Sequence, residues 1–114
     1  MEKKYRIKDS KRIQSILNTR RKTYDGCFSV YVDANEVNHI RYALSVGKKF
    51  GNAVKRNKVK RRIRMILHTH LEKDTPMDVF IIIRPDAANL TYGSIEKRLI
   101  KLLKAHKLIR GEKK

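Results

Sequence analysis

The sequence predicts an α+β fold, a small single-domain α-β sandwich in which helices pack on a mostly antiparallel sheet. Apolar and more polar residues alternate over 27–32 and 40–46, as in strands with one buried face. Residues 79–83 are instead an uninterrupted apolar run, typical of a central strand that is covered on both faces. Apolar residues recur at helical spacing over 53–71 and 92–107. With 114 residues, of which 40% are hydrophobic, the chain is long enough for one core.

The first element is predicted to be a helix over about 11–19, capped by Ser10. Its apolar positions, Ile13, Ile16 and Leu17, recur at helical spacing and would form its buried side.

The first strand follows a turn at Asp25-Gly26. Phe28, Val30 and Val32 occupy alternate positions and are expected to face the core. Tyr31 would then face the opposite side of the sheet, where an exposed ring can stack on an unpaired base.

The middle of the chain contains a polar connection over 35–39, the second strand, and a break over 48–52 before the long helix. Arg84-Pro85 ends the late strand, and the last helix follows. Three strands are thus predicted and a fourth is left open, with the helices expected on one face of the sheet.

Charge is the most unusual property of the sequence. Lys and Arg number 29 against 11 Asp and Glu, a net charge of +18. The 35 residues between Glu36 and Glu72 contain ten of these bases and no acid. A solvated helix face normally interleaves acids with bases, so this segment predicts a polyanionic partner.

The predicted long helix arranges part of this charge in a stripe. Arg56, Lys60 and Arg64 are spaced i, i+4 and i+8, and Asn57 and Arg61 lie beside them. Arginine grips phosphate with a planar fork of donors and lysine adds a point charge. Asparagine can both donate and accept, which suits a base edge or a ribose hydroxyl.

Several classes of function are disfavoured. The acids are scattered and do not gather in the sequence as in a two-metal nuclease. His68 and His70 would point about 200° apart on a helix, which makes them poor co-ligands. We therefore predict no catalytic residue and no metal ligand in the protein. The single cysteine, Cys27, excludes an internal disulfide. No apolar run approaches the ~20 residues that a membrane span needs. A cytoplasmic protein is therefore expected.

The segment 48–64, KKFGNAVKRNKVKRRIR, resembles the signature of the bacterial ribonuclease P protein subunit. Residues 5–8, 28–31 and 78–85 resemble other parts of that family, so the resemblance covers nearly the whole chain.

The resemblance implies an α-β sandwich with a left-handed β-α-β crossover, which departs from the usual handedness of such units. It also implies a single RNA-binding domain over 1–114, whose basic ends we expect to be flexible. The implied RNA-binding residues are Lys48, Lys49, Asn52, Arg56, Asn57, Lys60, Arg61 and Arg64. A central cleft that accepts single-stranded RNA would contain Ile13, Leu17 and Tyr31. The family often has aromatic residues at the first two of these positions, and aliphatic side chains stack less well on bases.

The implied function is that of an RNA-binding subunit of ribonuclease P, which removes the 5′ leader of precursor tRNA. The catalytic RNA would perform the cleavage with Mg²⁺ that is bound mainly by that RNA. The protein would bind both the catalytic RNA and the leader and would favour Mg²⁺ binding. No further protein partner and no membrane is expected. The alternative is a general RNA-binding protein, ribosomal or duplex-binding, without a processing role. An autonomous metal nuclease and a membrane-surface helix are less favoured.

Overall fold

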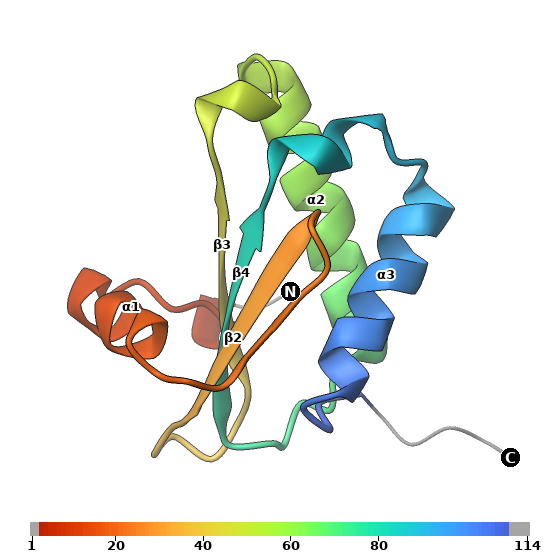
Figure 1. Cartoon of the computed structure of the whole chain (residues 1–114). Coiled ribbons are helices and arrows are strands. Elements are labelled where there is room, and N and C mark those ends of the chain that lie inside the picture. The colour runs from red at the N-terminus through yellow and green to blue at the C-terminus, as the bar shows by residue number, and fades with distance from the viewer. Residues whose placement is uncertain (1–2, 110–114) are drawn as a thin grey trace, which may run out of the picture.

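The computed structural model describes residues 3–109, which form a four-stranded sheet with helices on both of its faces (Figure 1). The α-helices are α1 (Ser10–Leu17), α2 (Ala53–His70) and α3 (Tyr92–Lys104). The strands are β1 (Lys22–Tyr24), β2 (Phe28–Ala34), β3 (Arg41–Val46) and β4 (Met77–Ile83). Short 3₁₀ helices are η1 (Lys3–Tyr5), η2 (Lys48–Phe50) and η3 (Pro85–Asn89). The expectation about flexible ends concerns residues that lie largely outside the described range.

The sheet has the strand order β1-β2-β4-β3. The pairs β1/β2 and β2/β4 are antiparallel, and β3/β4 is parallel. Two of the three pairings therefore confirm the mostly antiparallel sheet. Because α2 connects the parallel neighbours β3 and β4, these elements form the β-α-β unit that the resemblance implies.

The main core lies between the sheet and the helices α2 and α3, which share one face (Figure 1). Phe28, Val30 and Val32 point into it, as their alternation predicts. Tyr42 also belongs to this core and is 2% exposed.

Helix α1 covers the opposite face of the sheet, so the prediction that all helices pack on one face is wrong (Figure 1). Ile16 of α1 packs on Phe80 of β4, with Ile82 beside it, while Val79 and Ile81 face the main core. The continuous apolar run of β4 already indicated this arrangement, since a strand apolar on both sides needs cover on both faces.

Some predicted boundaries also change. Asp9, not Ser10, caps α1, because its Oδ1 accepts the backbone N–H of Lys11 at 3.0 Å. The helices α1 and α3 end at Leu17 and Lys104, earlier than their apolar patterns suggested. The fourth strand that the sequence left open is β1, a three-residue edge strand. Within residues 3–109, no helix combines the length and the apolar character that crossing a membrane requires.

Candidate RNA interface

The connection from β3 to α2 places three predicted RNA-binding residues on the surface. Lys48 and Lys49 lie on η2 and are exposed. Asn52 is exposed too, but it caps α2, since its Oδ1 accepts the backbone N–H of Lys55 at 2.9 Å. This acceptor is therefore engaged in the fold, and the amide N–H groups of Asn52 are what it can offer to RNA.

Gly51 fixes the shape of this connection. Its φ of 156° and ψ of −170° belong to a region that essentially only glycine occupies. A Cβ at this position would lie 2.9 Å from Cδ of Lys55. The Gly51 carbonyl accepts a hydrogen bond from Nε of Arg56 at 3.2 Å, so Arg56 also holds the loop against the helix.

The substitution Gly51→Ala is expected to destabilise the protein by about 1–3 kcal/mol, because alanine is strained in this conformation. Urea unfolding measures the difference. Gly47→Ala is the matched control, because Gly47 has a φ of −85° and open space around its Cβ direction. Equal stability of the two variants would show that the loop adapts to a side chain.

The basic stripe forms on α2 as its spacing predicts. Asn57 and Arg61 are exposed, whereas Arg56, Lys60 and Arg64 are half-buried along the edge of the apolar side of the helix. That apolar side consists of Val59, Ile63, Ile66 and Leu67, which are buried in the main core. At 1.5 Å per residue, the stripe from Arg56 to Arg64 is about 12 Å long.

The stripe ends beside a groove of about 200 Å³ that α1, α2 and β3 share. Its lining residues are Arg6, Ile7, Ile13, Tyr42, Ala43, Leu44, Lys60 and Arg64. The structure thus joins Lys60 and Arg64, predicted to bind RNA, with Ile13, predicted to line the central cleft. Two polar atoms of this lining, Tyr42 Oη and Arg64 Nε, are buried and have no hydrogen-bond partner within residues 3–109.

The three predicted cleft residues lie together on the α1 face of the sheet. Ile13, Leu17 and Tyr31 are half-buried and pack against the cluster formed by Ile7, Ile16 and Phe80. Nζ of Lys22 lies 5.5 Å from the centroid of the Tyr31 ring. The face therefore offers apolar surface with a cation beside its aromatic ring, a combination that binds unpaired bases. Leu17 and Tyr31 belong to this cluster but do not line the groove described above.

A buried carboxylate fixes α1 over this face. Asp78 of β4 is 0% exposed and accepts hydrogen bonds from Arg12 Nε at 2.7 Å and Arg41 Nη2 at 2.7 Å. Asn35 Nδ2 and Arg41 Nε donate to its second oxygen at 2.8 Å and 2.9 Å. Burial favours the protonated acid, but the hydrogen bonds from Arg41, Arg12 and Asn35 outweigh it and hold the pKa of Asp78 below its usual value.

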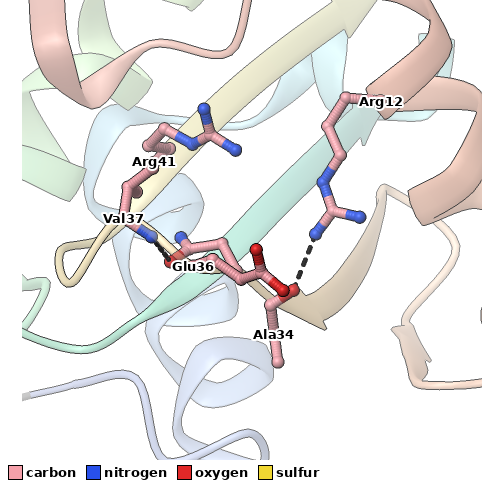
Figure 2. A pocket seen from close by; sticks show the side chains of 6 residues that line it. Arg12, Ala34, Glu36, Val37 and Arg41 are labelled. Carbon is pink, nitrogen blue, oxygen red and sulfur yellow. Dashed lines mark hydrogen bonds between the residues drawn. The ribbon is translucent and has the colours of Figure 1, made fainter.

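Arg12 extends this network to β2. Its Nη1 pairs with Asp33 at 3.0 Å. Its Nη2 donates to the Ala34 carbonyl at 2.8 Å, as Figure 2 shows. Because Arg12 directly precedes Ile13, these bonds set how the cleft residue sits on the sheet. Arg12, Arg41 and Asp78 were not among the predicted site residues. The sequence did contain one sign of this network, since Asp78 is a single acid at the start of an apolar strand.

Residues 3–109 contain no group of three His, Cys, Asp or Glu side chains that could hold a metal ion. The candidate interface combines a row of cations with an apolar face that contains an aromatic ring. These features are typical of a small α+β protein of the RNA-binding class.

Known proteins match this chain over nearly its whole length. A family model described as Ribonuclease P matches residues 1–107, and the chain belongs to this family of ribonuclease P protein components. It is a subunit that assists tRNA 5′ processing, an endonuclease reaction for which catalysis by RNA is consistent with the family.

Ribonuclease P proteins of several bacteria are similar to this chain. The ribonuclease P protein component of Mycoplasma capricolum is 42% identical over 106 residues, which cover 91% of this chain and 97% of the relative. That of Acholeplasma laidlawii is 37% identical over 113 residues, covering 98% and 97%. The solved RNase P protein of Staphylococcus aureus has a TM-score of 0.82 at 34% identity, covering 93% of this chain and 98% of its own. That of Thermotoga maritima has a TM-score of 0.78 at 25% identity, covering 93% and 98%.

Proposed function

We propose that this chain acts as a single RNA-binding domain that holds two RNAs at once. The stripe on α2 and the residues before it, Lys48, Lys49 and Asn52, bind the catalytic RNA subunit. The cleft on the α1 face, formed by Ile13, Leu17 and Tyr31, binds the single-stranded 5′ leader of precursor tRNA. We place the complex in the cytoplasm and infer that it needs no further protein.

The groove that Ile13 shares with Lys60 and Arg64 is the observation that supports this proposal most strongly. It makes the apolar cleft and the basic stripe continuous, so a leader on the α1 face would lie directly beside a catalytic RNA bound to α2. RNA that entered the groove could also accept hydrogen bonds from the unpartnered Tyr42 Oη and Arg64 Nε. The leader would then be held next to the RNA that cleaves it.

Mg²⁺ enters this proposal through the RNA. The described residues offer no group of three ligands, and the buried Asp78 is fully engaged by two arginines and Asn35. The protein's own contribution is positive charge, which screens the repulsion between two polyanions. Less Mg²⁺ is then needed to neutralise the two RNAs, because the protein supplies part of the positive charge.

Reconstitution of precursor-tRNA cleavage with the cognate catalytic RNA at low Mg²⁺ tests the function. We expect the protein to increase both the cleavage rate and the affinity for precursor, and the advantage to shrink as Mg²⁺ is raised. Absence of any gain would refute the proposal. Equal affinity for unrelated RNA duplexes and for the cognate RNA would instead favour the general RNA-binding alternative, and cleavage by protein alone would indicate an autonomous nuclease.

A further inference from the structure

The α1 face of the sheet has a second row of side chains beyond the cleft. One row across the strands consists of the paired residues Lys22, Tyr31, Phe80 and Ala43. The next row consists of Tyr24, Ser29, Ile82 and Ser45. The rows lie two residues apart along each strand, which is about 7 Å. This distance resembles the step between neighbouring nucleotides of an extended RNA strand.

The two rows share the same pairing of an aromatic ring with a cation. In the first row, Lys22 lies beside Tyr31. In the second row, the guanidinium of Arg84 lies 5.9 Å from the centroid of the Tyr24 ring. Arg84 donates through Nη2 to Ser29 Oγ at 3.0 Å, while its Nε is buried without a hydrogen-bond partner in the described chain.

Tyr24 is the most exposed tyrosine of the described residues, at 60%, and it lies on the edge strand of the sheet. A hollow of about 510 Å³ lies beside it at the edge of the sheet, where β1 meets α3 of the opposite face. The lining residues are Tyr24, Asp25, Lys97, Arg98, Lys101 and Leu102. The hollow thus combines an aromatic ring and the apolar side chain of Leu102 with three cations.

Asp25 is the one acid of this lining, and the fold already engages it. Its Oδ1 accepts the backbone N–H groups of Cys27 and Phe28, each at 3.0 Å, and its Oδ2 lies 3.4 Å from Nη1 of Arg98. The rim is therefore positive overall and suited to phosphate.

From this geometry we propose that Tyr24 and the hollow beside it form a second nucleotide subsite for single-stranded RNA. A base stacks on the Tyr24 ring, and Lys97, Arg98 and Lys101 contact the adjoining phosphates. A duplex does not fit this chemistry, because its bases are already stacked and expose no face to the ring.

The occupant is the 5′ leader, an assignment that rests on the proposed function. Strand β1 is at the edge of the sheet opposite β3, and α2 packs beside β3. A leader that starts near the catalytic RNA on α2 and passes the half-buried Ile13, Leu17 and Tyr31 on the α1 face reaches Tyr24 next. The subsite therefore takes leader nucleotides farther from the cleavage site than those at Tyr31.

Non-cleavable precursor tRNAs with leaders lengthened one nucleotide at a time test this subsite. Their dissociation constants are measured with the complex of full-length protein and catalytic RNA. For wild type we expect two successive gains in affinity. Tyr24→Ala should keep the first gain and lose the second, by about fivefold or more, and Tyr24→Phe should keep both because its ring can still stack. Tyr31→Ala should lose the first gain.

The other outcomes separate the two proposals. If Tyr31→Ala removes a gain and Tyr24→Ala matches wild type at every leader length, the second subsite is refuted and leader binding stands. If lengthening the leader gives wild type no gain, leader binding itself is refuted. If Tyr24→Ala weakens binding of the catalytic RNA without precursor, the hollow belongs to that RNA and the assignment to the leader is wrong.

Discussion

Replacing Asp78 with alanine is expected to lower the free energy of unfolding by about 3 kcal/mol. The change leaves Arg12 and Arg41 without the buried carboxylate that both of them bind, and removing one partner of a buried ion pair typically costs 3–5 kcal/mol. The value lies at the lower end of that range because both arginine side chains keep some contact with water, with exposures of 22% and 26%. Urea unfolding of the protein alone measures the loss.

Asp33→Ala is the matched control for this experiment. Asp33 also pairs with Arg12, but its side chain is 36% exposed, and exposed ion pairs contribute at most about 1 kcal/mol. If the two variants lose equal stability, burial of Asp78 is not the origin of the effect.

The same carboxylate gives the fold a specific dependence on pH. The pKa of Asp78 is lower in the folded protein than the usual 3.8, so the folded state favours the ionised form. Its contribution is fully present above the unfolded pKa and is lost as pH falls below about 3.8 toward the folded pKa. The wild-type free energy of unfolding should therefore fall more steeply in this acid range than that of Asp78→Asn.

Local patterns predicted most of the fold, because spacing within one segment specifies which residues share a face. The alternation at Phe28, Val30 and Val32 placed Tyr31 on the correct side of β2, and the helical period placed the stripe on the edge of α2. Strand β1 was not recognised because its sequence, Lys-Thr-Tyr, has one half-buried residue between two exposed ones and thus little apolar pattern.

The predicted site was less complete, because its remaining parts depend on contacts between distant segments. Arg12 and Asp78 are 66 positions apart, and in sequence Arg12 resembles any charged residue of a solvated helix. The role of Asn52 could not be predicted from its residue type, because asparagine suits both an RNA contact and a helix cap. Only the structure shows that its oxygen forms the cap.

The double substitution Arg61→Ala and Arg64→Ala is expected to weaken binding of the catalytic RNA about 100-fold, if each side chain contributes about 1.5 kcal/mol through a phosphate contact. Arg61 is exposed, and Nε of Arg64 has no hydrogen-bond partner in residues 3–109. The substitutions should therefore affect RNA binding much more than folding, and thermal unfolding of the variant checks this point.

The salt dependence of binding distinguishes contacts in the stripe from a general loss of charge. The slope of log K against log salt should become shallower by about 0.7–0.9 for each phosphate contact removed. The control is Lys55→Ala with Lys58→Ala, which removes the same charge from exposed positions on the other flank of α2. If the stripe binds RNA, the salt slope should change strongly when Arg61 and Arg64 are replaced and only slightly when Lys55 and Lys58 are replaced. Equal changes would mean that α2 attracts RNA only through its net charge, so that the arrangement of Arg61 and Arg64 has no specific role.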